Sequence, residues 1–413
     1  MADIRRNIQP KLEALLALFP VVMIVGARQT GKTTLAKMTR PKWKYVDLEK
    51  AMDYERISQD LSFFFQENPS DIIIDEAQSL PELFKELRNV IDQNRQQKNR
   101  FILTGSSSPE LLRQASDSLA GRIAIIELGT LKLNEYYQAP FPGLYSLFDQ
   151  KINDESITKL MQLNTSLKHK DIAHFHFIGG YPEPALAKSS HFYQQWMENY
   201  LKTYINRDIR KLFPRLDIVR FQRFILMLGN MSGTIINRSE IGRSINTSEV
   251  TIKDYLDIAE GSFIWRNIIS YEKSISKSIT KMSKGVIRDA GLQHYLKGIQ
   301  TQEDLNRHPY VGLDFEAFSI DEIIKGIQAT MTTNWSYSYY RTRNGVEIDL
   351  ILDGPFGILP IEIKYGTKTD RKQISNLHKF IIQHDLPLGL VINNSTEIIK
   401  LTDRVLQIPA TFL

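Results

Sequence analysis

A glycine-rich segment near the N-terminus has the residue types and the spacing of a phosphate-binding loop. Five apolar residues, 21–25, run directly into the pattern Gly-x-x-x-x-Gly-Lys-Thr at residues 26–33. Glycines let the backbone turn tightly, so that successive N–H groups can point at phosphate oxygens, and the following helix turns its positive end toward the same anion. Lys32 can reach the β- and γ-phosphates, and the hydroxyl of Thr33 can ligate Mg²⁺. The predicted nucleotide-contacting residues are Gly26, Ala27, Arg28, Gln29, Thr30, Gly31, Lys32, Thr33 and Thr34.

An ordinary strand-to-helix turn is the alternative for this loop, and the complete apolar strand before it argues against that alternative.

Two adjacent carboxylates, Asp75 and Glu76, follow a later apolar segment at residues 72–74. In a doubly wound sheet the carboxyl ends of the strands meet at one edge, so these side chains should lie beside the loop. We expect Asp75 to hold Mg²⁺ through water and Glu76 to act as general base on the attacking water. An isolated Asp-Glu pair is more often a helix cap, but its place after a phosphate-binding loop favours catalysis.

Two further residues are candidates for contacts with the γ-phosphate. Residues 101–103 predict a buried strand that ends in hydroxyl side chains, and Thr104 or Ser106 can sense the γ-phosphate by hydrogen bonding. A simple serine-rich loop is the alternative there. Arg122 precedes one more predicted strand, residues 123–128, and is a candidate arginine finger for its own site or for a neighbour's site in a ring. A surface charge is the alternative for Arg122.

The C-terminal part of the chain carries a second group of charged residues with a spacing that suits catalysis. Residues two apart in a strand share a face, so Glu362 and Lys364 project together, and Asp349 on the preceding strand can reach the same point. Two carboxylates there would bind one or two Mg²⁺ ions, while Lys364 orients or deprotonates the attacking water. Glu316, on a preceding helix, is a further candidate ligand. This Asp … Glu-x-Lys constellation resembles the motif of phosphodiesterases that cut nucleic acid, although a half-exposed hairpin alternates polar and apolar residues in any case.

The elements expected around this group form a recognisable order of helix, three strands, helix and strand. Their predicted bounds are 311–324, 336–341, 346–352, 358–364, 370–383 and 388–392. This order is the core of restriction-endonuclease-like folds. The sequence therefore predicts a nuclease-like fold here, with working catalysis left open against a role as a binding platform.

The segment 237–256 predicts two short helices joined by a tight polar turn, as in a helix-turn-helix. The apolar residues expected to pack are Ile241, Ile245, Val250, Ile252, Leu256 and Ile258. Asn246, Thr251 and Lys253 would face outward, where they can contact phosphates or base edges. Residues 263–269 look like the hairpin of a winged helix. A serine-rich basic wing would follow, with Lys273, Lys277, Lys281, Lys284 and Arg288.

Winged helices also mediate protein contacts, so a packing module with a solvated run of charges is the alternative to DNA binding.

The overall composition permits both DNA binding and a packing role. The chain has 413 residues with 52 Lys and Arg against 47 Asp and Glu, a net charge of +5. Cysteine is absent, which excludes disulfides and thiolate zinc sites. No apolar run approaches the ~20 residues needed to cross a bilayer, so we expect a cytoplasmic protein with no membrane contact.

Several segments together resemble AAA-type ATPases of prokaryotes, in the group that couples this domain to a C-terminal domain of unknown function. In the first third of the chain they are residues 26–34, 72–78, 103–107 and 119–122. The resemblance continues through residues 177–183 and 200–209 and covers nearly the whole chain. It implies an AAA-type P-loop ATPase core, with ATP and Mg²⁺ as ligands.

The expected fold class is α/β: a P-loop AAA-type doubly wound parallel sheet, then a helical lid, a winged helix and a C-terminal restriction-endonuclease-like domain. The expected domain bounds are 1–134, 135–215, 216–284 and 285–413. We predict an ATPase that couples its nucleotide state to DNA binding through the winged helix, with possible Mg²⁺-dependent nuclease activity and possible homo-oligomers. The alternative is an ATP-dependent switch whose last two domains only bind partners.

Overall fold

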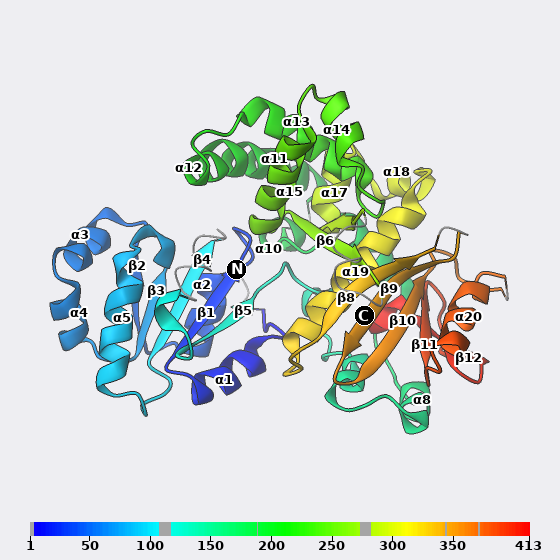
Figure 1. The fold of residues 1–413 in the computed structure, drawn as a ribbon, viewed down its shortest axis with the longest axis horizontal. Coiled ribbons are helices and arrows are strands. Elements are labelled where there is room, and N and C mark those ends of the chain that lie inside the picture. The colour runs from blue at the N-terminus through cyan, green and yellow to red at the C-terminus, as the bar shows by residue number, and fades with distance from the viewer. Residues whose placement is uncertain (1–3, 107–116, 188, 273–281, 343–344, 371) are drawn as a thin grey trace. The chain divides into compact units, whose positions relative to one another are not determined.

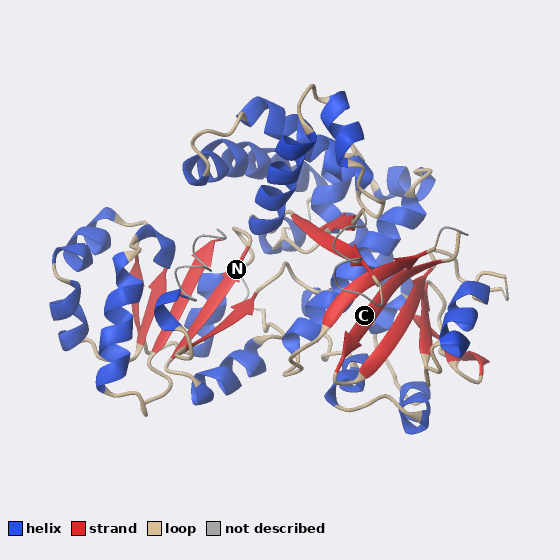
Figure 2. Ribbon diagram, in the orientation of Figure 1, coloured by secondary structure: helices blue, strands red, loops and turns tan. Residues whose placement is uncertain are grey.

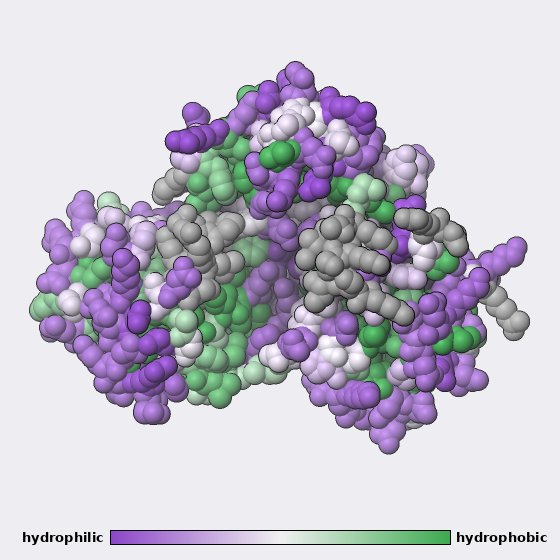
Figure 3. All heavy atoms as spheres, in the orientation of Figure 1, coloured by the Kyte–Doolittle hydropathy of each residue, from purple (hydrophilic) through white to green (hydrophobic). Residues whose placement is uncertain are grey.

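The computed structural model describes residues 4–106, 117–187, 189–272, 282–342, 345–370 and 372–413. The chain divides into two compact units. The first comprises residues 1–130 with 261–263, and the second comprises residues 131–260 with 264–413. In the part of the chain that the structure describes, no helix is both long enough and apolar enough to cross a membrane. The visible surface of both units is mostly hydrophilic, with smaller apolar patches (Figure 3).

The first unit is built on a five-stranded sheet with the order β2-β3-β4-β1-β5 (Figure 1). Every paired strand in it is parallel. The strands are β1 (Val21–Gly26), β2 (Lys44–Asp47), β3 (Ile72–Asp75), β4 (Phe101–Ser106) and β5 (Ile123–Glu127). The helices are α1 (Gln9–Leu18), α2 (Lys32–Thr39), α3 (Ala51–Gln59), α4 (Leu61–Glu67) and α5 (Glu82–Gln93). The predicted parallel α/β core is therefore confirmed.

The apolar strands of this sheet are buried on both faces, which explains why they read as continuous hydrophobic runs. All six residues of β1 are buried. On one face, Val21, Met23 and Val25 join the apolar residues of α4 and α5 in a single core. On the other face, α1 and α2 contact β1, with Leu12 and Leu16 fully buried. The parallel arrangement brings the ends of β1, β3 and β4 to one edge of the sheet.

The second unit combines a helical layer with an eight-stranded sheet, β12-β13-β11-β10-β9-β8-β6-β7 (Figure 2). Its strands are β6 (Trp265–Ser270), β7 (Lys284–Ile287), β8 (Ser336–Arg341), β9 (Glu347–Gly354), β10 (Gly357–Ile363), β11 (Gly389–Asn393), β12 (Ile399–Thr402) and β13 (Val405–Pro409). The helices up to residue 261 are α7 (Leu133–Tyr136), α8 (Asp154–Met161), α9 (His169–Ile178), α10 (Pro182–Leu186), α11 (Ser190–Thr203), α12 (Arg210–Leu212), α13 (Ile218–Met231), α14 (Arg238–Ser244) and α15 (Glu249–Gly261). Those beyond it are α17 (Ala290–Leu296), α18 (Gln302–Arg307), α19 (Val311–Ala329) and α20 (Ser375–Gln383), and three shorter turns, η2 (Gly143–Asp149), η3 (Tyr204–Ile209) and η4 (Ala410–Phe412), complete the layer.

The hairpin β6–β7 joins the C-terminal sheet, which the sequence did not indicate. β6 pairs antiparallel with β7, and at its far end Ile269 and Ser270 pair in parallel with Ser338 and Tyr339 of β8. The helices α13 to α15 share one apolar core with Trp265 of β6 and Ile287 of β7. The helical module and the C-terminal sheet are thus parts of one folded unit.

Candidate active site

The phosphate-binding loop runs from the end of β1 to the start of α2, and its backbone requires glycine at two positions. A Cβ on Gly26 would lie 2.2 Å from the carbonyl oxygen of Leu128, so no larger residue fits there. Gly31, directly before α2, has φ 91°, a left-handed conformation that disfavours other residues. Gln29 also has a positive φ, 64°. The loop predicted from the sequence therefore has the tight backbone winding that a phosphate-binding loop requires.

Lys32 is the buried cation of this loop. Its side chain is 6% exposed, and its Nζ donates hydrogen bonds to the carbonyl oxygens of Gly26 at 3.0 Å and Ala27 at 2.8 Å. Burial lowers the pKa of Lys32, and the nearby charges of Glu76 and Asp75 act in the opposite direction. A buried ammonium group that is hydrogen-bonded to loop carbonyls is well placed to exchange those carbonyls for phosphate oxygens.

Asp75 is surrounded by hydroxyl donors. Its Oδ2 accepts hydrogen bonds from Thr33 Oγ1 and from the Tyr45 hydroxyl, both at 2.8 Å. Its Oδ1 accepts one from the hydroxyl of Thr104. The structure therefore brings together Thr33 and Asp75, the two residues predicted to hold Mg²⁺. It also places Thr104, the predicted γ-phosphate sensor, against the same carboxylate.

Tyr45, on β2, is a residue of this site that the sequence reasoning missed. Burial comes first among the causes that raise the pKa of its hydroxyl, and the carboxylates of Asp75 and Asp47 raise it further, so the hydroxyl stays a proton donor. The ammonium of Lys37 lies 3.4 Å from the centre of its ring. No local pattern marks this tyrosine, because its partner Asp75 is 30 positions away in the chain.

Glu76 adopts a left-handed backbone conformation, φ 53° and ψ 48°, which costs a residue other than glycine about 1 kcal/mol. Its Oε2 accepts hydrogen bonds from the side chain of Gln78 and from Ser106, whose Oγ lies at 2.8 Å and backbone N at 3.2 Å. Burial alone would raise the pKa of Glu76, but the charge of Lys32 and these hydrogen bonds lower it below its usual value. The carboxylate is therefore ionised and held at the edge of the sheet next to Asp75.

The two arginines predicted near the nucleotide both form ion pairs. Arg28 of the loop contacts Glu49 at 2.8 Å. Arg122 forms a two-pronged contact with Asp92, with both N···O distances at 2.8 Å. Arg122 directly precedes Ile123, which pairs with Val21 at the start of β1, and the loop begins at the other end of that strand. Five residues of strand span roughly 17 Å. At this distance Arg122 cannot act as an arginine finger for its own nucleotide site, so that part of the prediction is wrong. A role as an arginine finger for a neighbouring molecule's site remains a proposal.

The predicted residues of the C-terminal group do lie together, but lysines balance their charge. The Nζ of Lys364 lies 2.5 Å from Glu362 Oε1 and 3.5 Å from Asp349 Oδ2. The same Asp349 oxygen accepts the backbone N–H of Ile363 at 2.7 Å. Glu316, on α19, is paired instead with the buried ammonium of Lys284 on β7. Burial, followed by the charge of Asp349, raises the pKa of Glu316 to about 7 and that of Glu362 to about 8.

The predicted metal-binding carboxylates are paired with lysines in the structure. Within the described ranges of the chain, no three histidine or carboxylate side chains are placed to hold a metal ion. Lys284 explains part of this difference. The sequence placed it on an exposed basic wing, and that expectation is wrong, because Lys284 is 1% exposed and neutralises Glu316. Three other predicted wing residues, Lys273, Lys277 and Lys281, lie outside the described residues.

The predicted pair of helices is present as α14 and α15, joined by a turn in which Asn246 has φ 55°. Ile241, Ile245, Ile252 and Ile258 are buried as expected, but Val250 is 69% exposed and does not pack. The outward side chains of α15 are mostly acidic. Glu249, Asp254 and Asp257 are exposed there, against the single exposed cation Lys253. This surface would repel the phosphates of DNA.

Comparison with known families assigns the domain that contains the first site. Residues 18–137 match the family described as AAA domain. Residues 169–303 and 311–413 match two domains of unknown function, DUF8612 and DUF4143.

Similar proteins come from bacteria and archaea. An uncharacterised protein of Mycobacterium tuberculosis is 28% identical over 413 residues, which is 98% of this chain and 83% of the relative. One of Haemophilus influenzae is 21% identical over 328 residues, covering 73% of this chain and 76% of the relative. Among solved structures, the Walker-type ATPase of Pyrococcus abyssi matches 71% of this chain and 95% of its own, with 13% identity and a TM-score of 0.38. The RuvB Holliday junction branch migration motor of Thermotoga maritima matches 64% and 89%, with 17% identity and a TM-score of 0.31. Residues 18–137 therefore match the AAA domain family, and residues 311–413 of the same chain match the DUF4143 family.

Proposed function

We propose that the first unit binds ATP and hydrolyses it with Mg²⁺ at the edge formed by the ends of β1, β3 and β4. One observation carries this proposal: the buried ammonium of Lys32 lies within the glycine loop, with Asp75 and Glu76 close enough to influence its charge. A buried cation needs a compensating anion, and a phosphate chain bound along the loop supplies one. Lys32 would contact the β- and γ-phosphates.

The donor set around Asp75 fits Mg²⁺, which takes one or two carboxylates together with hydroxyl, phosphate and water oxygens. Thr33 and Asp75, whose oxygens are 2.8 Å apart, would hold it. When bound, Mg²⁺ supplies positive charge that offsets the charge developing on the phosphates. The ionised Glu76 would orient the attacking water and accept its proton, and Thr104 would contact the γ-phosphate.

The test is the variant Lys32→Ala, with the exposed Lys42→Ala as its matched control. We expect Lys32→Ala to lose both retention of radiolabelled ATP and phosphate release, because the phosphates lose their cation. Lys42→Ala should behave as the parent does. Failure of the folded parent protein to retain any nucleotide would overturn the proposal.

We further propose that the nucleotide state is coupled to DNA binding by the second unit. The support is a winged-helix order of elements: α13, α14 and α15 are followed by the antiparallel hairpin β6–β7. The net charge of +5 is compatible with this role. ATPase activity measured with and without DNA tests the coupling, and we expect DNA to change the rate.

Cleavage of DNA by the C-terminal domain is a separate proposal that rests on its element order. α19, β8, β9, β10, α20 and β11 follow one another as in restriction-endonuclease-like folds. Metal binding for cleavage would require the ion pairs of Lys284 with Glu316, and of Lys364 with Glu362 and Asp349, to open. Incubation of plasmid DNA with the purified protein and Mg²⁺ or Mn²⁺ tests it, and an intact plasmid while ATP is consumed would refute it.

The second candidate function is an ATP-dependent switch whose second unit binds a partner and cuts nothing. Two observations favour it: the acidic outward face of α15 and the neutralised C-terminal carboxylates. The switch predicts ATP hydrolysis that neither DNA nor divalent metal at the C-terminal site affects. Measuring DNA-stimulated ATPase activity and DNA cleavage on one preparation separates the two candidates. A ring that places Arg122 at a neighbour's nucleotide would require a stable oligomer in solution.

A further inference from the structure

One short segment of the second unit, residues 207–223, has an excess of positive charge. Residues 207–223 contain six basic residues, Arg207, Arg210, Lys211, Arg215, Arg220 and Arg223, and two acids, Asp208 and Asp217. Six minus two gives a net charge of +4 in these 17 residues. The segment lies outside the helix-turn-helix pair in sequence but shares a cavity with α15, the second helix of that pair.

Contacts between short neighbouring elements hold this segment together, and we call four of its arginines the arginine surface (Arg210, Arg215, Arg220 and Arg223). η3 contacts both α12 and α13, and the side chain of Gln222 on α13 donates a hydrogen bond of 3.0 Å to Asn206 on η3. Arg210, Arg215 and Arg223 are exposed, and within the described residues they form no ion pair. Asp217 is already engaged, because it lies 3.7 Å from Arg220 and also caps α13. The surface therefore presents at least three uncompensated guanidinium groups.

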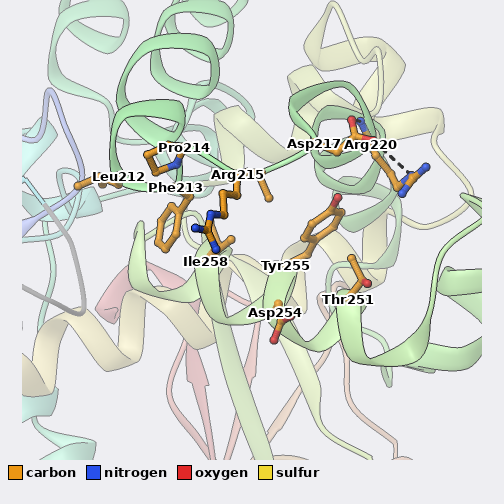
Figure 4. A pocket seen from close by; sticks show the side chains of 11 residues that line it. Leu212, Phe213, Pro214, Arg215, Asp217, Arg220, Thr251, Asp254, Tyr255 and Ile258 are labelled. Atoms are coloured by element: carbon orange, nitrogen blue, oxygen red, sulfur yellow. Dashed lines mark hydrogen bonds and ion pairs between the residues drawn. The ribbon is translucent and has the colours of Figure 1, made fainter.

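A cavity of about 580 Å³ opens beside these guanidinium groups (Figure 4). One wall is the segment 212–217 and the other is α15. Phe213, Pro214 and Ile258 give it an apolar lining, while Arg215 and Arg220 also face it. Asp254 and Thr251 supply polar atoms on the α15 side. A cavity with an apolar lining, and with exposed carboxylate and guanidinium groups at its border, suits a flat ring that carries amino groups and is linked to phosphates.

We propose that the arginine surface and this cavity bind a single-stranded segment of nucleic acid. Arg210, Arg215 and Arg223 contact successive phosphates, and an unstacked base enters the cavity beside Phe213. Asp254 accepts a hydrogen bond from an amino group of that base, as carboxylates do from cytosine. Single-strand binding proteins combine a positive groove with aromatic side chains in this way. The inference rests on the proposed DNA function and names its contact surface.

The geometry favours a single strand over a duplex for two reasons. A duplex keeps its bases stacked, so none is free to enter a cavity. The outward face of α15, which would have to enter the major groove, carries Glu249, Asp254 and Asp257 against Lys253 alone. Phosphates are attracted to the arginine surface and repelled by α15.

Fluorescence anisotropy with the full-length protein tests the proposal, using a labelled 20-nucleotide single strand and the duplex of the same sequence. The double variant Arg215→Ala/Arg223→Ala should bind the single strand at least tenfold more weakly. Each lost phosphate contact should reduce the slope of log affinity against log salt by about 0.7. Phe213→Leu, which keeps an apolar side chain but removes the ring, should weaken binding by about fivefold or more. The matched controls, Arg243→Ala on α14 and Lys253→Ala on α15, should stay within twofold of the parent.

The remaining outcomes each overturn a distinct statement. If the parent binds DNA and the arginine variants bind equally well while Lys253→Ala binds weakly, the contact surface is wrong and the DNA function stands. If the duplex binds as tightly as the single strand and Phe213→Leu has no effect, the base cavity is wrong. If the parent binds an acidic peptide through these arginines and no nucleic acid, both this proposal and the DNA function fail. Unchanged basal ATPase activity and thermal melting of the variants show that they are folded.

Discussion

The hydroxyl of Tyr45 donates a 2.8 Å hydrogen bond to Asp75 Oδ2, the same oxygen that accepts the hydroxyl of Thr33. Tyr45 thereby fixes the orientation of the carboxylate that we propose for Mg²⁺ binding. Residues that orient a metal ligand in this way commonly change metal affinity about tenfold when they are removed. The relationship joins β2 to β3 at the edge of the sheet where the phosphate-binding loop lies.

We expect Tyr45→Phe to raise the Mg²⁺ concentration for half-maximal ATPase activity by about tenfold. The maximal rate at saturating Mg²⁺ should change little, because the ring and its packing remain. The exposed Tyr54→Phe on α3 serves as the control. A Tyr45→Phe enzyme with an unchanged Mg²⁺ requirement would show that the hydroxyl does not act through Asp75.

Glu76→Gln should separate nucleotide binding from turnover. The amide is the same size as the carboxylate but cannot accept a proton from water, so we expect kcat to fall by about 10²-fold or more. Affinity for ATP should persist, because Lys32 and the loop are intact. Single-turnover phosphate release measures the loss, with the exposed Glu82→Gln as comparison. Turnover at the parent's rate would remove Glu76 from the proposed base role.

Lys284→Met should destabilise the second unit, because it leaves the carboxylate of Glu316 buried without its cation. Removing one partner of a buried ion pair typically costs about 3–5 kcal/mol. The double variant Lys284→Met/Glu316→Leu should recover much of the loss. The exposed pair of Lys202 and Glu198 provides the contrast, and Lys202→Met should leave stability nearly unchanged. Urea unfolding followed by tryptophan fluorescence measures all three, and equal losses for both single variants would contradict the assignment.

The second unit should lose stability as the pH falls from about 6.5 to about 4. Burial lowers the pKa of His294 to about 4, although its hydrogen bond with the Phe177 carbonyl and the charge of Asp314 act in the other direction. In this window the unfolded chain binds a proton that the folded chain does not, so the free energy of unfolding decreases with falling pH. Between pH 7 and pH 5 this one group accounts for about 2 kcal/mol.

His294→Asn removes that proton-binding group, so the fall in stability between pH 7 and pH 5 should be smaller by about 2 kcal/mol. Substitution of the exposed His191 by Asn should leave the fall unchanged. Urea unfolding at the two pH values gives the comparison. An equally steep fall in the His294 variant would mean that other groups carry the acid sensitivity.

The first site was largely predictable because its signal is local. The loop Gly26–Thr34 and the pair Asp75 and Glu76 are each continuous in sequence, and parallel strands bring their ends together without further information. The C-terminal order of elements was predictable for the same reason: β8 spans Ser336–Arg341, as expected, and β10 ends within one residue of its predicted end. In these segments the apolar residues recur with the spacing of a strand or of a helix, which identifies the type of element.

What escaped prediction depends on pairing between distant segments. Tyr45 and Lys284 gain their roles from partners 30 and 32 positions away, which no spacing rule indicates. The pairing of β6 with β8 joins segments nearly 70 residues apart, and β12 and β13 extend the sheet beyond the predicted core. Val250 fits a helical apolar stripe but lies on its outer margin, where the core does not reach.

The shared strand pairing of β6 and β8 limits how this protein can be divided. A cut between the helical module and the DUF4143 domain would expose the backbone donors and acceptors of β6 and leave Glu316 without its ammonium partner. Such fragments should aggregate through the opened strand. We therefore expect the two segments to fold only when they are expressed together.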